Sequence, residues 1–451
     1  NATNAETDWQ DQVLRAALQQ NHTLSFSGGN DKTQYYVSGN YLDQPGIIKG
    51  SDFNRGSMRF NLTSQLNSRI SLRTYMTASR TVSNGFSASD NSPTRYTGKN
   101  GVGAMVLASP TVPVYNPDGT YGNPRPFSFS GIDVENPLAF TKEYLDRNTV
   151  VRFQGGMDFN VKLAEGLVNT TRIGGDYFSA RADLYFPIVL AQLSSGVGIG
   201  QLTTTSSLNV VAEDYLEYKK KFGDLEFEGI VGGSIQSAQQ DIINLLGSKY
   251  ISDDLKNYSF AAAGSVSKPV TDIITNRLVS GFSRVRLNFK DRYLFTASIR
   301  RDGASVFSKN KKYGIFPSLG LAWKASEEPF MKNVTAISNL KVRATWGQSG
   351  NPAIQPYQSL LIGNVINTAQ GAGSGLAVGL SPTLPNDNLT WETTTQTNAG
   401  LDFGFLNDKY RVTLDYYVKN TTSLLATVQL PPSSGYNTII DNVGEVENKG
   451  F

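Results

Sequence analysis

Alternation of apolar and polar residues over long stretches is the feature that most restricts the fold of this chain. Between Val151 and Val161, the odd positions hold Val, Phe, Met and one Gly, whereas most even positions hold Arg, Gln, Asp or Asn. Because successive side chains of a strand point to opposite faces, such a strand has one apolar and one polar face. The same alternation recurs at 58–63, 70–76, 284–289, 292–299, 340–346 and 411–419.

The length of these segments favours a membrane barrel. We count about fifteen of them, each roughly 10 residues long or longer, whereas strands of soluble proteins average about 5–6 residues. A transmembrane barrel strand needs about 9–11 residues when it is tilted, and no apolar run is long enough for a transmembrane helix. The pattern therefore predicts an all-β fold, an antiparallel transmembrane β-barrel. A soluble sandwich is the alternative; a propeller is disfavoured because no repeat of about 40–50 residues is present.

The connections between the segments alternate between short and long. Short turns on one rim and long loops on the other are typical of outer-membrane barrels. One connection on the short side, 326–337, is longer and is expected to hold a helical turn. The predicted turns are Gly28–Lys32, Asn67–Ser68, Ala164–Gly166, Phe222–Asp224, Lys290–Asp291 and Leu406–Lys409, and the predicted long loops are 81–147, 183–200, 237–275, 301–313, 347–390 and 425–442.

The composition of the chain excludes several kinds of functional site. The chain has no cysteine and a single histidine, His22, so neither a thiolate centre nor a multi-histidine metal centre can form. The net charge of +3 does not indicate a nucleic-acid-binding protein. No phosphate-binding glycine loop occurs, and His22 has no evident acid partner for a serine triad. We therefore expect no catalytic residue, no metal and no cofactor.

Several short sequences occur in a fixed order along the chain. Together they resemble the SusC/RagA-like family of TonB-linked outer-membrane transporters, and the resemblance covers nearly the whole chain. The sequences are Thr7–Gln12, Ser25–Gly39, Tyr41–Ile48, Arg300–Gly303, Phe316–Trp323, Ser326–Met331, Ser338–Arg343, Gly347–Asn351, Trp391–Gln396 and Asn442–Phe451.

The resemblance implies a barrel of about 22 strands that is plugged by an N-terminal domain. It also implies import energised by the inner-membrane TonB complex, a SusD-like surface lipoprotein that caps the barrel, and a place in the lipid of the bacterial outer membrane. Family substrates are mostly oligosaccharides, with peptides in one branch. The plug, its TonB box and the last strands have no counterpart here, so we expect residues 1–451 to form a part of the barrel domain.

Aromatic residues of the long loops are the candidate substrate-binding residues. Aromatic rings can stack on sugar rings while polar neighbours bind hydroxyls; loop packing and contact with the lid are the alternatives. Polar residues on the strands are expected mostly to satisfy one another inside the barrel, and Arg300 is expected to pair locally with Asp302. The candidates are Tyr96, Tyr115, Tyr121, Phe127, Phe129, Tyr357 and Tyr436, whereas Trp323, Trp346 and Trp391 are assigned to an interfacial aromatic belt.

The sequence and the resemblance together predict a non-enzymatic importer of oligosaccharides. Four alternatives stay open at this point: a peptide importer of the same family, a passive porin, a surface binding protein that transports nothing, and an outer-membrane barrel enzyme. A plug with a TonB box would separate an importer from the last three.

Overall fold

One large antiparallel sheet makes up most of the fold. The computed structural model describes residues 5–85, 101–127, 134–190, 196–331, 333–334, 336–370 and 373–451. Within them the strands of this 16-stranded sheet are neighbours in chain order, with β9 paired to β8 beside the main path. The strands are β1 (Gln20–Gly29), β2 (Thr33–Pro45), β3 (Asp52–Gln65), β4 (Ile70–Asn84), β5 (Leu145–Ala164), β6 (Leu167–Phe186), β7 (Ile199–Phe222), β8 (Leu225–Tyr250), β9 (Ala263–Val266), β10 (Val270–Phe289), β11 (Tyr293–Ala304), β12 (Tyr313–Lys324), β13 (Ile337–Asn351), β17 (Glu392–Phe405), β18 (Tyr410–Thr422) and β21 (Glu445–Gly450).

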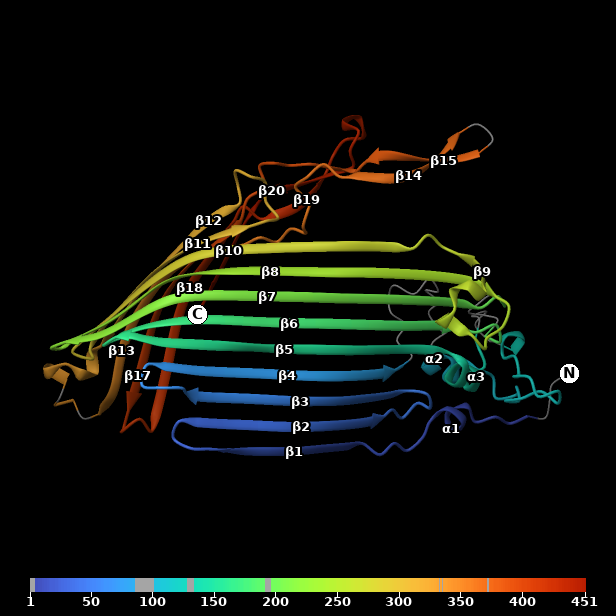
Figure 1. The fold of residues 1–451 in the computed structure, drawn as a ribbon, viewed down its shortest axis with the longest axis horizontal. Coiled ribbons are helices and arrows are strands. Elements are labelled where there is room, and N and C mark those ends of the chain that lie inside the picture. The colour runs from blue at the N-terminus through green and yellow to red at the C-terminus, as the bar shows by residue number, and fades with distance from the viewer. Residues whose placement is uncertain are drawn as a thin grey trace.

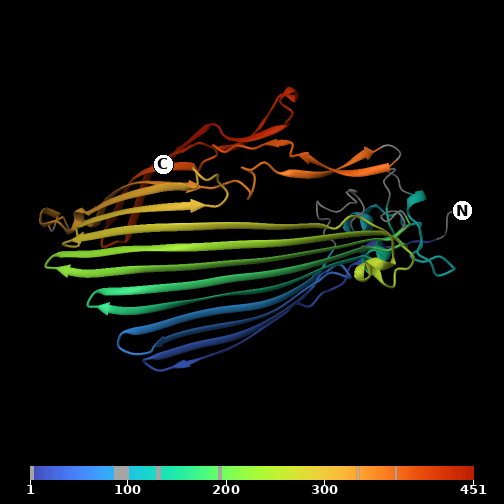
Figure 2. The same ribbon diagram turned by 45° about the horizontal axis from the view of Figure 1, so that its top comes forward.

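The sheet is strongly curved and open. The path of paired strands runs from β1 to β21, and no pairing joins these two strands in the described part of the chain. Figure 1 shows β10 running beside β8, whereas β13, β17 and β18 run at a steep angle behind the ends of the earlier strands. Figure 2 shows the same curved sheet from a second direction. This is the arrangement expected of part of a barrel, and the predicted fold class and the expected number of strands are confirmed.

The strand register separates the residues into two faces. Paired residues share a face, and Leu72 pairs with Phe159 on one face while Asp158 pairs with Arg172 on the other. We call the face that carries Leu72 and Phe159 the apolar face. It includes exposed side chains such as Phe153 and Ile235, which are 46% and 61% accessible. We call the face that carries Asp158 and Arg172 the polar face. The predicted alternation is therefore confirmed.

Several strands are longer than predicted. β7 and β8 have 24 and 26 residues, and β8 continues to Tyr250 through a region that we had predicted as the long loop 237–275. That prediction was wrong because Ser237, Gln239 and Asp241 make the apolar face polar, which ends the alternation. Backbone pairing with β7 nevertheless continues beyond this point, as the pairing of Asp241 with Ser206 shows.

Smaller elements lie in the connections. The expected helical turn in 326–337 is confirmed by the 3₁₀ turns Ala325–Glu327 and Pro329–Met331. Among the described residues, no helix has the length and apolar character needed to cross a membrane. The remaining elements are α1 (Trp9–Val13), α2 (Gly101–Leu107), α3 (Pro137–Glu143), three 3₁₀ turns at Arg125–Phe127, Lys256–Tyr258 and Phe260–Ala262, another at Pro432–Ser434, and the short strands β14 (Gly363–Gln370), β15 (Gly373–Leu380), β16 (Thr383–Leu384), β19 (Leu425–Gln429) and β20 (Thr438–Asn442).

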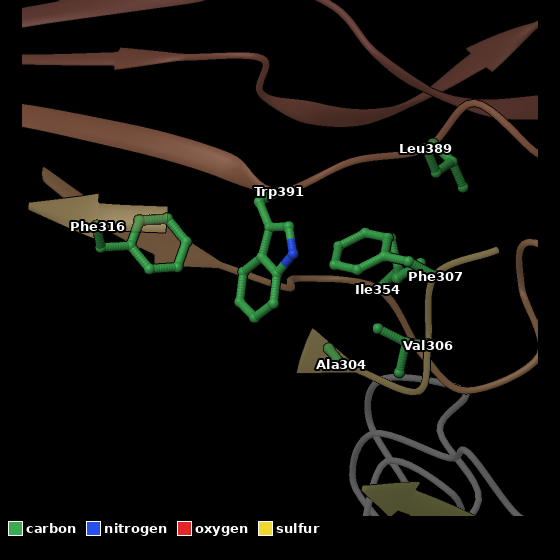
Figure 3. Close-up of a cluster of buried hydrophobic side chains, with 7 residues drawn as sticks. All are labelled: Ala304, Val306, Phe307, Phe316, Ile354, Leu389 and Trp391. Carbon is green, nitrogen blue, oxygen red and sulfur yellow. The ribbon is translucent and has the colours of Figure 1, made fainter. Parts of the chain in front are cut away.

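A hydrophobic core joins three connections at the long-loop rim, and we call it the loop core. Trp391 is 5% accessible and lies at its centre, with its ring 5.4 Å from that of Phe307 and 5.5 Å from that of Phe316 (Figure 3). The Trp391 Nε1–H donates to the Lys312 carbonyl at 3.1 Å. The assignment of Trp391 to an interfacial belt was therefore wrong. The loop core consists of Ala304, Val306, Phe307, Phe316, Ile354, Leu389 and Trp391.

Candidate functional site

The polar face encloses a large hollow at the curved end of the sheet. Residues of β7, β8, β10–β13, β17 and β18 all line this single hollow of about 1110 Å³. Strands so far apart in the sheet can line one hollow only from the concave side, so the polar face is the concave one. The lining includes Glu228, Arg286, Thr296, Arg343 and Gln396. Such a wall suits a water-filled interior, as in outer-membrane barrels.

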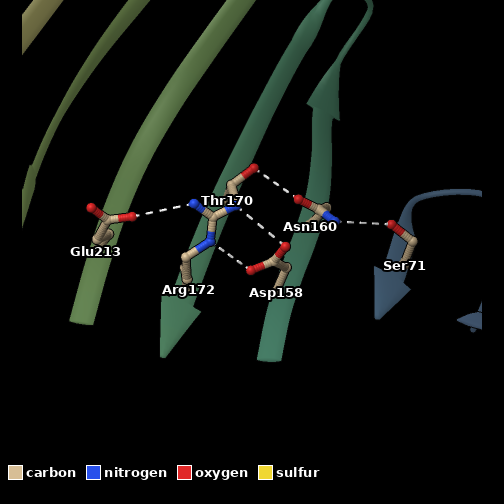
Figure 4. Close-up of polar contacts among 6 residues, drawn as sticks. All are labelled: Ser71, Asp158, Asn160, Thr170, Arg172 and Glu213. Atoms are coloured by element: carbon tan, nitrogen blue, oxygen red, sulfur yellow. Dashed lines mark hydrogen bonds and ion pairs between the residues drawn. The ribbon is translucent and has the colours of Figure 1, made fainter. Parts of the chain in front are cut away.

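Ion pairs satisfy most charges of this wall. Arg172 of β6 forms two bonds to Asp158 of β5, with Nε–Oδ1 at 2.7 Å, and its Nη1 lies 3.4 Å from Glu213 of β7 (Figure 4). Asn160 continues the network by accepting from Thr170 and donating to Ser71. These contacts cross four strands. The expectation that interior polar residues satisfy one another is confirmed here. Equivalent pairs are Arg152–Asp176, Arg284–Glu228, Arg286–Glu228, Arg343–Asp402 and Arg343–Asp415.

The wall formed by β3 and β4 is an exception to this pairing. Arg55, Arg59 and Arg73 belong to the polar face by register, and all three are exposed. Within the described residues, none of these guanidinium groups has an ion pair or a side-chain hydrogen bond. These three guanidinium groups are therefore free to bind a solute on the concave side of the sheet.

Two of the candidate aromatic residues meet at the long-loop rim. Tyr115 and Tyr121 lie 5.2 Å apart, ring centroid to centroid, at the two ends of a turn around Asp118. Lys142 of α3 donates to the Tyr115 hydroxyl at 3.0 Å, and the Tyr121 hydroxyl donates to Glu143 at 2.8 Å. Burial and the bond to Glu143 raise the pKa of Tyr121, which keeps its hydroxyl protonated. We call Tyr115 and Tyr121 the tyrosine pair.

The tyrosine pair is held on the concave side of the sheet by α3. Ala139 and Phe140 of α3 pack on Phe186, a residue of the polar face near the end of β6. Asn136, which is 3% accessible, caps α3 by accepting from the backbone N–H groups of Leu138 and Ala139. Its amide donates to the carbonyls of Val114 and Gly122, which flank the turn. The pair is therefore fixed to the mouth of the concave face.

The described candidates Phe127, Tyr357 and Tyr436 do not join this pair. Phe127 is 43% accessible on a 3₁₀ turn, and Tyr357 is 44% accessible on the connection between β13 and β14. Tyr436 follows the 3₁₀ turn Pro432–Ser434. Tyr96 and Phe129 lie outside the described residues. Their roles in substrate binding remain predictions.

Comparison with known proteins identifies the family. A family model described as the TonB dependent receptor-like β-barrel matches residues 110–451. This chain belongs to the TonB-dependent receptors. The TonB-dependent receptor P3 of Formosa agariphila is 31% identical over 99% of this chain, and so is the TonB-dependent receptor SusC of Bacteroides thetaiotaomicron. The chain spans only 44% and 45% of the lengths of these two proteins.

Solved structures agree on the fold. A structure described as the RagAB peptide transporter superposes with a TM-score of 0.82 and 23% identity, over 99% of this chain and 49% of that one. At this identity the match concerns the fold alone. The SusC/RagA-like resemblance is confirmed, and the receptor is of the SusC/RagA type.

The structure of this TonB-dependent receptor places Trp323, which the sequence assigns to an interfacial aromatic belt, among further aromatic residues beside the short turns. Tyr293 pairs with Trp323 across β11 and β12 on the apolar face, close to the short-turn rim. Neighbouring rings stack beside the turns, with Phe289 6.3 Å from Tyr293 and Phe405 5.1 Å from Tyr410. The sequence signal for these further residues is an aromatic residue on the apolar face directly beside a short turn, which occurs at three of the turns, with Phe222, with Phe289 and Tyr293, and with Phe405 and Tyr410. Trp346 lies on the same face but further from that rim, opposite Leu319.

Proposed function

We propose that this receptor takes part in TonB-dependent import of oligosaccharides across the bacterial outer membrane. The observation that carries the proposal is the polar hollow on the concave face, in a chain of the TonB-dependent receptor family. A hydrated solute needs such a wet path because it cannot enter lipid. The apolar face is the surface that would contact lipid, and its aromatic residues beside the turns fit a membrane interface.

The rest of the machinery is part of the proposal. Because relatives are about twice as long as this chain, we place the plug domain with its TonB box and the remaining barrel strands outside residues 1–451. A SusD-like lipoprotein would close the barrel from outside. The β14–β15 hairpin offers a docking surface, since its strands pair only with each other among the described residues, and Val378 on the hairpin and Leu361 just before it are 79% and 57% accessible.

The coupling to TonB can be tested directly on the full-length protein in cells. We expect removal of the TonB box to abolish uptake of a fluorescent oligosaccharide while surface binding persists, because binding needs no energy input and release into the periplasm does. Uptake that survives the deletion would indicate a passive porin. Binding without uptake in the unmodified protein would indicate a surface binding protein, and hydrolysis of the oligosaccharide would indicate an enzyme.

The tyrosine pair supports an oligosaccharide as the substrate. Two neighbouring rings present apolar faces for sugar stacking, while Lys142, Glu143 and Asp118 lie close enough to bind hydroxyl groups. Peptides are the second candidate, because a protein of this fold is described as a peptide transporter. Peptide uptake in place of oligosaccharide uptake by the same cells would favour that candidate.

Removal of the tyrosine pair is expected to weaken binding. Tyr115→Ala with Tyr121→Ala should lower the affinity of the full-length protein for its oligosaccharide about 5- to 150-fold, since each stacked ring contributes roughly 0.5–1.5 kcal/mol. Calorimetric titration measures this change. The control is Tyr258→Ala, which removes an exposed loop tyrosine that is 58% accessible. Equal affinities for the double variant and the control would remove the tyrosine pair from the proposed site.

A further inference from the structure

A cluster of unpaired cations lies where the apolar face ends at the long-loop rim. The apolar-face positions of β10 run from Phe289 to Val279, and the next one is Arg277. Arg277, Lys309 and Lys312 line a cleft of about 460 Å³ together with Tyr357. In the described part of the chain, none of these three cations has an ion pair or a side-chain hydrogen bond. We call this the cationic cleft.

An apolar groove adjoins the cationic cleft. It has a volume of about 470 Å³ and shares Arg277, Ser305 and Lys312 with the cleft. Most of its other lining residues belong to the apolar face of β7, β8, β10, β11 and β12, so it opens on the side that would face lipid. They include Val210, Ile235, Val279 and Tyr313, which are 40%, 61%, 45% and 56% accessible.

A fourth cation borders the groove. Arg301 also belongs to the apolar face, since it pairs with Gly281 and Ile315. Its guanidinium carbon lies 4.5 Å from the centre of the Tyr313 ring. Asp387 is bonded to the cleft lining, but it accepts its hydrogen bond from Ser308 rather than from a cation. The positive charge of this region is therefore not neutralised by the described residues.

A ligand that fills both the cleft and the groove needs two chemically different parts. An acyl chain would cover the groove, and an anionic headgroup would reach Arg277 and Lys312, which border both. Phosphate suits this position because it offers several acceptor oxygens to Arg and Lys at once. A soluble acidic oligosaccharide would leave the groove exposed.

We propose that the cationic cleft and the apolar groove bind a phosphate-bearing lipid of the outer membrane. The inference uses the membrane placement proposed above but not the import activity. The lipid would fasten the long-loop rim to the membrane beside the loop core, because Val306 and Phe307 belong to both the loop core and the cleft lining.

Native mass spectrometry of the full-length protein in neutral detergent tests this proposal. The probes are bisphosphorylated lipid A, dephosphorylated lipid A, phosphatidylglycerol and hexagalacturonate. We expect saturable binding of a phosphate-bearing lipid, and a loss of affinity of about 10- to 30-fold in Arg277→Gln/Lys312→Gln, from the attraction of about 1 kcal/mol per basic residue near a membrane surface. Val279→Trp, which fills the groove at an exposed position, should lower the affinity about tenfold by excluding part of the acyl chain.

The matched control is Lys220→Gln/Lys409→Gln. It removes two positive charges beside the short turns at the other rim, where the two lysines lie over Phe222 and Tyr410. Retained binding in the control and loss in the other two variants support the site, and the preferred probe tells whether the phosphate belongs to lipid A or to a glycerophospholipid. Equal binding of dephosphorylated lipid A, equal loss in the control, or preferential binding of hexagalacturonate to the cleft would overturn it. Because no transport is measured, failure of the import proposal leaves this outcome unaffected.

Discussion

Replacing Trp391 by alanine is expected to lower the free energy that holds the loop core closed by about 3–5 kcal/mol, as for other buried Trp or Phe residues. The indole contacts Phe307 and Phe316 and donates to the Lys312 carbonyl, so its loss removes packing and one hydrogen bond together. The connections that pack together in this core should then open more often. Hydrogen–deuterium exchange of the full-length protein in peptides covering 304–312, 352–362 and 385–391 measures this opening.

Trp346→Ala is the matched control for this experiment. Trp346 is 39% accessible on the apolar face and does not belong to the loop core, so exchange in the three peptides should stay unchanged. Similar exchange in Trp391→Ala and in the unmodified protein would show that the loops are held in place by contacts other than the loop core.

Replacing Asn136 by alanine is expected to destabilise the attachment of the tyrosine pair by about 2–3 kcal/mol. Roughly 1 kcal/mol comes from loss of the helix cap, and the rest from leaving the Gly122 carbonyl without its donor. The Val114 carbonyl keeps the Gly122 N–H as a partner. Exchange should increase in peptides covering 113–122 and 134–144, and the affinity for oligosaccharide should fall along with it.

Asn136→Asp separates the two roles of this side chain. An aspartate still accepts from the N–H groups of Leu138 and Ala139, but it cannot donate to the turn. We expect increased exchange in 113–122 with α3 protected. If Asn136→Ala left both peptides as protected as in the unmodified protein, the tyrosine pair would not depend on Asn136.

The two largest expected effects concern the long-loop rim, although most of the hydrogen-bonded structure lies in the sheet. Backbone pairing continues along every strand, so one side chain contributes little to it. The loops at this rim instead depend on a few residues that each make several contacts, such as Trp391 and Asn136.

Local sequence predicted the strands and their faces well. Side chains alternate with a period of two whatever the strand pairs with, so the face of Phe153 or Asp158 followed from its position alone. The same reasoning failed for β8 beyond Ile235, because there the alternation ends while pairing with β7 continues. Strand ends depend on the neighbouring strand, which local pattern does not include.

The sequence by itself determined the all-β class, the alternation of apolar and polar faces, the polar interior and, through its motifs, the SusC/RagA-like family. Only the tertiary structure decided that Tyr115 and Tyr121 form a pair on α3, that Trp391 is buried, and that Arg277, Lys309 and Lys312 share a cleft. The physical reason is the range of the interactions. Alternation within a strand is set by neighbouring residues, whereas these three arrangements depend on contacts between connections that are distant in sequence and brought together by the closing curve of the sheet.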